Sequence, residues 1–286
     1  MIRTGELRIQ APITREGRIR AAATLRTSQG EGKLWFSLDE SQAAVLTDRA
    51  DPFLLAALWP MMRRGGRLSV RGAPVSAGLV DNLLRFQRVW RIWRGGSLVT
   101  IDAEIAEGAQ TPAATVAAFS GGVDSSFTIW RHAHGGAQPP VGQVAMVHGF
   151  DIPLADTMGF AGARALARRL VDTLGVGLID MSTNIRSVNR DWEDAHGLCV
   201  AAALTLLSGS FGAGLIAGSS SRFAPVVPWG SNHLTDPLLG SSNFAILHDG
   251  DAERTEKLSE LLEWPEARRL LRVCYSGPRY DRNCGC

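Results

Sequence analysis

The sequence predicts an α/β protein in which a doubly wound parallel sheet follows a smaller N-terminal α+β domain. Two observations carry this prediction. From Thr115 onward, continuous apolar runs alternate with helical patterns, as in a parallel sheet with both faces covered by helices. Before that point, shorter runs alternate between apolar and polar residues, as in strands with one face in water. A stretch with glycine and proline at 107–112 separates the two patterns, so we expect domains at 1–110 and 111–286.

Length and composition narrow the classes of protein to consider. With 286 residues, of which 45% are hydrophobic, the chain can bury one large core or two smaller ones. A formal net charge of +2 does not indicate a dedicated nucleic-acid surface. No apolar run reaches the length of a bilayer span, and the N-terminus has no signal-peptide core. We therefore expect a cytoplasmic protein with a small-molecule substrate and no membrane partner. Nucleic acid is the less favoured partner, and a homodimer is compatible with the sequence.

The N-terminal part is expected to combine short strands with two helices and to hold no catalytic constellation. Asp51-Pro52 precedes an apolar run, which predicts a helix with the aspartate as its cap and the proline in its first turn. The aromatic face around Trp90 and Trp93 in the second helix is expected to be core or domain interface rather than a ligand site. The expected strands cover 6–9, 19–25, 34–38, 68–70 and 98–105, and the expected helices cover 53–62 and 79–93.

The C-terminal part is expected to alternate strands with helices. In a doubly wound sheet, ligands bind beyond the carboxyl ends of the strands, near the point where the winding reverses. The segments that follow the first four strands are all rich in glycine and small or polar residues; they are 120–126, 148–151, 182–184 and 218–222. The expected strands cover 116–119, 143–148, 177–181, 214–217 and 244–247, and the main expected helices begin near 124 and cover 155–174, 194–207 and 254–263.

The stretch SGGVDSS at 120–126 has the residue types of a phosphate-binding loop. Paired glycines let the backbone turn sharply and approach an anion, and a helix that begins at Asp124 or Ser125 offers unpaired N–H groups. The same residues also occur in a plain strand-to-helix junction. Neither GxxxxGK[ST] nor GxGxxG is present, so the ordinary P-loop and the Rossmann fingerprint do not apply.

SGGVDS resembles the signature of the PP-loop ATP pyrophosphatases, which split ATP between its α and β phosphates and adenylate a substrate. The resemblance covers about 115–286 and implies the PP-loop (HUP-like) fold, with ATP and Mg²⁺ at the loop. Asp124 is then either a helix cap or a carboxylate that orients the loop or helps to hold Mg²⁺. The nucleotide-binding residues that it implies are Ser120, Gly121, Gly122, Val123, Asp124, Ser125, Ser126, His148 and Gly218.

Four side chains beyond the loop are candidates for substrate contacts, each with a structural alternative. Asp151 faces the substrate or serves the turn before Pro153. Arg222 pairs with a phosphate or carboxylate, or is simply exposed to solvent. His233 and Asp236 lie in the long segment 225–237, which we expect to be the acceptor-binding loop because long irregular loops are often functional.

Two further residues leave alternatives open. Lys257 either neutralises departing pyrophosphate as a catalytic residue, together with Asp124, or pairs with Glu253 or Glu260 on a solvated face. His196, near the start of an apolar helix, is expected to be structural more often than an acid or base.

The C-terminal tail carries a second signal, CYSG at 274–277 followed by NCGC at 283–286. Cys274, Cys284 and Cys286 are suited to structural Zn²⁺, although three thiolates are one short of a closed site. Together with the loop, the tail resembles the 7-cyano-7-deazaguanine synthase branch of the superfamily, which binds zinc at a C-terminal cysteine knot. That family's pattern includes further cysteines.

We therefore expect an enzyme that adenylates a carboxylate- or amide-type small molecule, releases pyrophosphate and transfers the activated group to an amine, ammonia or a sulfur donor. Such an enzyme works by orientation and charge stabilisation rather than by a protein nucleophile. The alternatives are a tRNA-modifying enzyme of the same superfamily and a nucleotide-binding module without turnover.

Overall fold

The structure is a computed structural model that describes residues 4–108, 111–219, 227–250 and 252–273. Its strands are β1 (Thr4–Arg15), β2 (Arg18–Thr27), β3 (Gly30–Asp39), β4 (Gly66–Arg71), β5 (Val75–Ser76), β6 (Val99–Asp102), β7 (Ile105–Ala106), β8 (Thr115–Ala118), β9 (Gln143–His148), β10 (Gly177–Thr183), β11 (Ala213–Ala217) and β12 (Ala245–Asp249). Its α-helices are α1 (Asp51–Met62), α2 (Leu79–Arg94), α3 (Val123–Ala133), α4 (Thr157–Asp172), α5 (Trp192–Thr205), α6 (Arg254–Leu261) and α7 (Ala267–Leu270). Three 3₁₀ segments are η1 (Glu40–Val45), η2 (Ile185–Ser187) and η3 (Asp236–Leu239).

One ten-stranded, mostly parallel sheet runs through the molecule in the order β12-β11-β8-β9-β10-β3-β2-β1-β4-β6. The expected α/β class is confirmed, and the strands from β8 to β12 are parallel to one another. From β8 the chain winds through β9 to β10, and it then returns to the other side of β8 with β11. The winding therefore reverses between β8 and β11, the place where ligands bind in such sheets.

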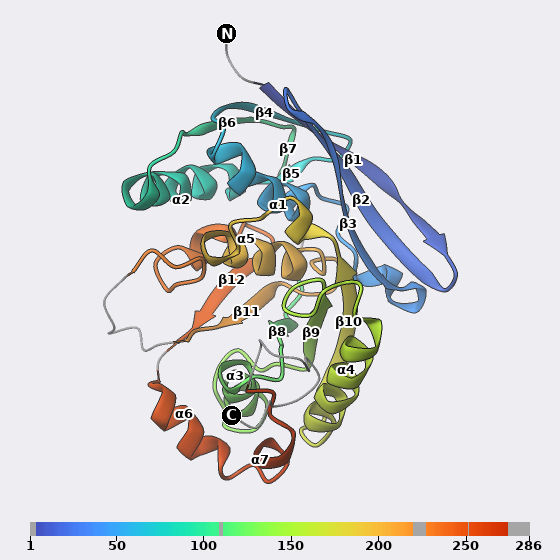
Figure 1. Cartoon of the computed structure of the whole chain (residues 1–286), viewed down its shortest axis with the longest axis vertical. Coiled ribbons are helices and arrows are strands. Elements are labelled where there is room, and N and C mark those ends of the chain that lie inside the picture. The colour runs from blue at the N-terminus through green and yellow to red at the C-terminus, as the bar shows by residue number, and fades with distance from the viewer. Residues whose placement is uncertain (1–3, 109–110, 220–226, 251, 274–286) are drawn as a thin grey trace.

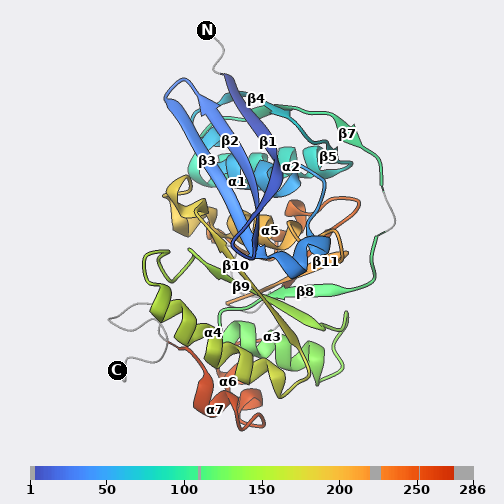
Figure 2. The same ribbon diagram turned by 90° about the vertical axis from the view of Figure 1, so that its right-hand side faces the viewer.

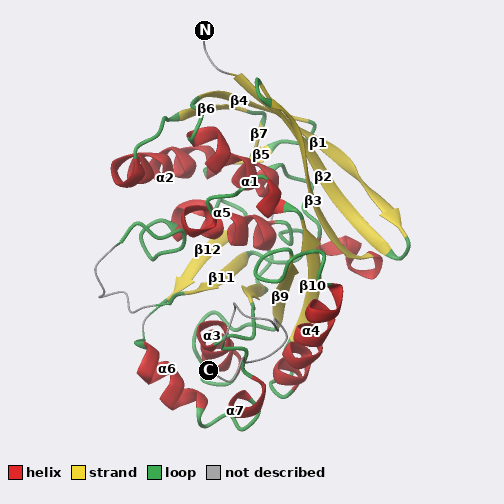
Figure 3. Cartoon of the chain, viewed as in Figure 1, coloured by secondary structure: helices red, strands yellow, loops and turns green. Residues whose placement is uncertain are grey.

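Two cores lie on opposite faces of the parallel strands, because successive strand residues point to opposite faces. Val116 and Ile216 belong to the core that contains α1 and α5, whereas Ala117 and Leu215 belong to the core that contains α3 and α4. Figures 1 and 3 show the same layering, with α5 above these strands and α3, α4, α6 and α7 below them. The continuous apolar runs of the sequence are explained by this double burial.

The N-terminal strands extend the same sheet instead of forming a separate one. β3 pairs antiparallel with β10, where Leu38 stands opposite Met181, and the meander β3-β2-β1 continues outward. Figure 2 shows β1 to β3 lying over α1 and α2, with α3 and α4 toward the opposite end of the molecule. The shared sheet joins the two parts, and the division of the chain near residue 110 stays a sequence-based prediction.

Helix α1 is the centre of the upper core, and all twelve of its residues are buried. It packs against α5 and β1, so an apolar helix with no polar face is stable there. The expected aspartate cap is wrong: Ala50 is the N-cap, and the Asp51 carboxylate accepts a hydrogen bond from the Ser76 N–H at 2.8 Å. The aromatic residues of α2 are core, as expected, with the Trp59 and Trp90 rings 4.9 Å apart.

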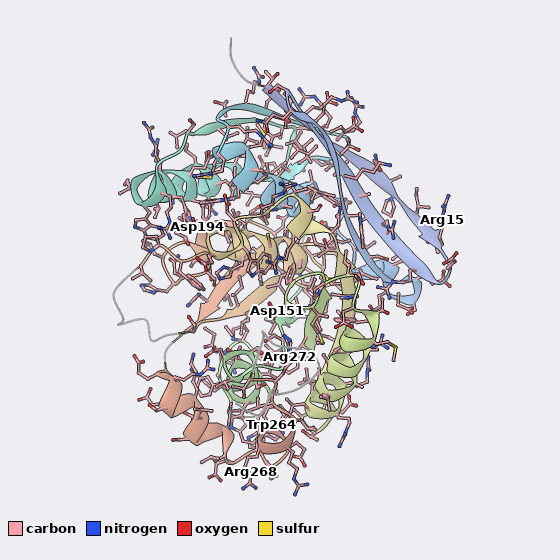
Figure 4. The ribbon with its side chains drawn as sticks, viewed as in Figure 1. Arg15, Asp151, Asp194, Trp264, Arg268 and Arg272 are labelled. Atoms are coloured by element: carbon pink, nitrogen blue, oxygen red, sulfur yellow. The ribbon has the colours of Figure 1, made fainter. Side chains whose placement is uncertain are left out.

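The single strand expected at 98–105 is instead two, β6 in the large sheet and β7 paired with β5 in a separate two-stranded sheet. The other expected elements are confirmed within the described residues, with shifts of a few residues at their ends. The largest difference is β1, expected at 6–9, which extends to Arg15 because β2 pairs with it along its length. Arg15 marks the far end of this hairpin in Figure 4. Within the described ranges, no helix is long and apolar enough to cross a membrane.

Candidate functional site

A cavity of about 280 Å³ lies where the winding of the sheet reverses. Its walls come from the carboxyl ends of β8, β9 and β11, from α5, and from the segment that precedes η3. All of its lining residues lie between Ala118 and Arg272, so the N-terminal strands and helices contribute none. The polar and aromatic side chains that line it include Ser120, Asp124, Ser125, Phe150, Asp151, Trp192, His196, Trp229, Ser231 and Arg272.

The glycine loop forms one end of this cavity. Gly121 has φ +75°, a conformation that favours glycine, and the extended Gly122 is the N-cap of α3. The Ser120 hydroxyl accepts a hydrogen bond from the Gly122 N–H at 3.2 Å. The Ser125 hydroxyl accepts from the Ser120 N–H and donates to the Gly122 carbonyl, each at 3.3 Å. Two hydroxyls thus hold the turn in shape and border the cavity.

The residues expected to bind nucleotide do not all face the cavity. Ser120, Asp124 and Ser125 line it, whereas Gly121 and Gly122 shape the turn. Val123 is core, and the fully buried Ser126 hydroxyl has no hydrogen-bond partner within the described residues. The His148 imidazole does not line the cavity. Its Nε2 lies 2.9 Å from the Pro153 carbonyl oxygen, and its ring stacks on Phe160 with the centroids 4.4 Å apart. Gly218 contributes its carbonyl to Lys257.

Lys257 and Asp124, the two expected catalytic residues, lie together at the loop. The Lys257 ammonium is 2.9 Å from Asp124 Oδ1, and its side chain is only 1% exposed. Arg254 reaches the other carboxylate oxygen at 2.8 Å. The alternative in which Lys257 pairs with Glu253 or Glu260 on a solvated face is wrong, because α6 packs on α3 and turns the lysine inward.

Arg272 is a site residue that the sequence did not single out. Its guanidinium donates to Asp151 Oδ2 at 2.9 Å and to the Ser120 carbonyl at 3.1 Å, and its backbone N–H donates to the Gly121 carbonyl. Figure 4 shows Arg272 and Asp151 close together below the strand ends. Asp151 is therefore more than a turn residue, because it borders the cavity and neutralises this cation. No local pattern marks Arg272, which comes 152 residues after Ser120.

Aromatic rings form the other end of the cavity. Adjacent ring centroids are 5.3 Å apart for Phe150 and Trp192, 6.1 Å for Trp192 and His196, and 5.3 Å for His196 and Trp229. The segment with Trp229 sits tightly on α5: a Cβ on Gly197 would lie 2.0 Å from the Gly230 carbonyl oxygen. The close approach of these two glycines places Trp229 beside the histidine.

His196, which was expected to be structural more often than an acid or base, also lines the cavity. Its Nδ1 lies 3.1 Å from the carbonyl oxygen of Trp192 and 3.1 Å from that of Glu193, both in the preceding turn of α5. Burial lowers the pKa of His196, and these hydrogen bonds offset the effect only in part. The imidazole is thus favoured in its neutral form at the cavity wall.

The segment expected to bind the acceptor reaches the cavity through Trp229 and Ser231 rather than through His233 or Asp236. Asp236 is fully buried, accepts from the Ser231 hydroxyl at 2.6 Å and lies 2.7 Å from His248 Nδ1. It therefore holds Ser231 in place. The ring centroids of His233 and His248 are 6.3 Å apart, and His233 is absent from the described cavity lining.

The expected zinc ligands Cys274, Cys284 and Cys286, and also Arg222, lie outside the described residues. Over the described ranges, no group of three or more His, Cys, Asp and Glu side chains is arranged to hold a metal ion. Cys199 is fully buried and burial raises the pKa of its thiol, so it is not a reactive thiolate.

Comparisons of the chain with protein-family models, with curated proteins and with solved structures found no match.

Proposed function

We propose that the chain is an ATP-dependent adenylating enzyme that releases pyrophosphate, as the resemblance of its glycine loop to the PP-loop implies. The observation that carries the proposal is the convergence of Lys257, Arg254 and Arg272 on one glycine loop at the reversal point of the sheet. Three cations and a helix N-terminus suit a polyphosphate, because they offset its negative charge.

The middle of the cavity suits the adenine ring. The strand ends supply small and apolar side chains around Ala118, Val147 and Ala217, which leave room for a flat ring between the sheet and α5. With the base there, the phosphates would extend toward Ser120 and Ser125. The aromatic end around Trp192 and Trp229 is left for the acceptor.

Asp124 and Asp151 are the two carboxylates in the described cavity lining, and they fit a Mg²⁺ ion. Magnesium is commonly bound by one or two carboxylates together with substrate phosphates, so the absence of a three-ligand protein cluster in the described ranges is compatible with it. When bound, the ion would offset charge on the phosphates. Asp124 would then share its charge between the metal and Lys257.

The protein's part in the reaction is orientation and charge stabilisation. An acceptor oxygen would attack the α-phosphorus, and the bond between the α-phosphorus and the bridging oxygen would break. Lys257 and Arg254 would stabilise the negative charge that develops on pyrophosphate. Arg272, held by Asp151 and the Ser120 carbonyl, would keep the loop closed around the phosphates.

The test is incubation with ATP and Mg²⁺ across a panel of carboxylate and amide metabolites, with separate assays for AMP, pyrophosphate, ADP and phosphate. We expect AMP and pyrophosphate in equal amounts with at least one acceptor, and loss of both products after chelation of the metal. Formation of ADP and phosphate as the only products would contradict the proposal.

A further inference from the structure

We propose that His196 is a catalytic base that takes a proton from an amine or ammonia nucleophile as it attacks the adenylated acceptor. The inference rests on the proposed function and deepens it, because it selects a nitrogen nucleophile over a sulfur donor. It also assigns a role to the aromatic end of the cavity.

The hydrogen bonds of His196 select the nitrogen that can act as a base. Carbonyl oxygens only accept, so the contacts to Trp192 and Glu193 require the hydrogen on Nδ1. Nε2 then carries the lone pair. Within the described residues Nε2 has no hydrogen-bond partner, and the residue lines the cavity shared with Ser120 and Asp124.

The charges around His196 keep the imidazole available as a base. Asp151, on the loop after β9, and Asp236, on η3, attract a proton to His196, but each is already paired, with Arg272 and His248 respectively. Burial outweighs their attraction and lowers the pKa of the imidazole. A base that is neutral near physiological pH can accept a proton during attack.

The walls around His196 suit a nitrogen nucleophile. Phe150 and Trp229 present aromatic rings, which stabilise the positive charge that develops on the nitrogen of an uncharged amine or ammonia as it attacks. The Trp192 ring already stacks with the Arg186 guanidinium, 4.5 Å from its centroid. Arg272 is the one Lys or Arg side chain in the described cavity lining, and its charge is matched by Asp151. The positive charge that develops on the attacking nitrogen would therefore meet little net repulsion within this lining. A thiol donor would gain less from these rings, because its sulfur develops no comparable positive charge as it attacks.

The step is a substitution at the activated carbon. The nitrogen lone pair attacks that carbon and forms the C–N bond, and one N–H proton passes to His196 Nε2. The C–O bond to AMP then breaks, and its electron pair leaves with the AMP oxygen. The imidazolium returns the proton to water, so no oxidant, reductant or further reactant is needed.

The experiment compares two nucleophiles on an acceptor that supports pyrophosphate release. Ammonia needs a base during attack, whereas hydroxylamine is uncharged at neutral pH and traps activated acyl groups without one. The proteins are the wild type, His196→Ala and the control His134→Gln, which changes an exposed histidine. Products are quantified by mass spectrometry, and thermal unfolding of each variant checks its folding.

We expect His196→Ala to lower the ammonia-dependent kcat by roughly 10²–10⁴-fold. The hydroxylamine-dependent rate should fall far less, and free imidazole should restore part of the ammonia-dependent rate. Equal losses with both nucleophiles and no rescue would overturn the role of His196 while leaving adenylation intact. A transfer that accepts only thiols would also overturn it. If no acceptor supports pyrophosphate release, the proposed function fails, and this inference fails with it.

Discussion

Asp51 and Asp124 both lie in the first turn of a helix, yet their surroundings give them different roles. Asp51 is 2% exposed and accepts a hydrogen bond from the Ser76 N–H, and burial raises the pKa of its carboxyl group. Asp124 borders the cavity and pairs with Lys257 and Arg254. The same residue type in the first turn of a helix is thus structural in one half and part of the candidate site in the other. The partners brought by the tertiary fold make the difference.

The comparison extends to the two halves of the sheet. The parallel half gathers its polar residues at one edge, because the carboxyl ends of parallel strands meet there. The N-terminal half contributes no cavity residue within the described ranges, but it supports the site from outside. Arg94 on α2 donates to the Pro228 carbonyl at 3.0 Å and pairs with Asp194 on α5 at 3.1 Å. Asn82 donates to the Gly240 carbonyl at 3.0 Å.

The largest effect is expected for Lys257→Met, which removes the buried cation at the loop while keeping its length. If Lys257 stabilises departing pyrophosphate, AMP formation should fall by roughly 10²–10³-fold. The measurement is the initial rate with ATP and an active acceptor. Arg268→Gln, an exposed change on α7, is the matched control and should keep the wild-type rate. A wild-type rate for Lys257→Met would contradict a catalytic role for Lys257. It would indicate that Lys257, like Asp51, has a structural role.

The next effect concerns stability and not catalysis. Asp51→Ala leaves the buried Ser76 N–H without its partner, which should lower the free energy of unfolding by about 1–3 kcal/mol. The measurement is urea unfolding. Affinity for ATP, from isothermal titration of the folded variant, should be unchanged. A selective loss of ATP binding at unchanged stability would contradict the division between the two aspartates.

A smaller effect is expected at the support between the halves. Arg94→Gln removes a partly exposed ion pair, so stability should change by no more than about 1 kcal/mol. The same side chain also donates a hydrogen bond to the Pro228 carbonyl, next to Trp229 in the cavity wall. Loss of this bond should therefore raise the KM for the acceptor a few-fold and leave kcat nearly unchanged. Steady-state kinetics measures both, and Arg88→Gln on the same helix is the control. Equal kinetics for the two variants would show that α2 does not position this segment.

The smallest effect is a pH dependence. The carboxyl pKa of Asp51 is raised above its usual 3.8 by burial, so its contribution to stability is fully present below pH 3.8 and is lost as pH rises through the higher folded-state value. Asp51→Asn cannot ionise but can still accept from Ser76. The wild type should therefore lose stability relative to this variant as pH rises above 3.8. A constant difference in urea midpoint from pH 4 to pH 7 would count against it.

Much of the fold could be predicted from the sequence because its signals are local. Apolar runs located each strand from β8 to β12, and β9 was predicted at its observed bounds. The glycine loop was predicted as the turn after the first parallel strand, and the structure has it there. The sheet-wide pairing of β3 with β10 could not be predicted, because alternation along a strand does not identify its neighbour.

The candidate site divides in the same way. Ser120 and Asp124 could be predicted as site residues because they follow a strand and flank a glycine turn. Arg272 could not, since an arginine after a short helix has no local signature. His196 was noticed but expected to be structural, since a histidine in an apolar helix usually is. His233 and Asp236 were expected to face a substrate, but they pack around His248 instead. Residue type and loop length do not determine which side chains of a loop turn inward.

By itself the sequence determined the order of strands and helices, the two-faced burial of the parallel sheet and the sharp turn at Gly121-Gly122. Each of these depends on residues that are close in the chain. The tertiary structure alone decided that Lys257 meets Asp124 from 133 residues away and that Arg272 meets Asp151 from 121 residues away. It also joined the glycine loop and His196 in one cavity. The physical reason is that parallel strands bring distant loops to a common edge, and only packing of the helices decides which side chains point into it.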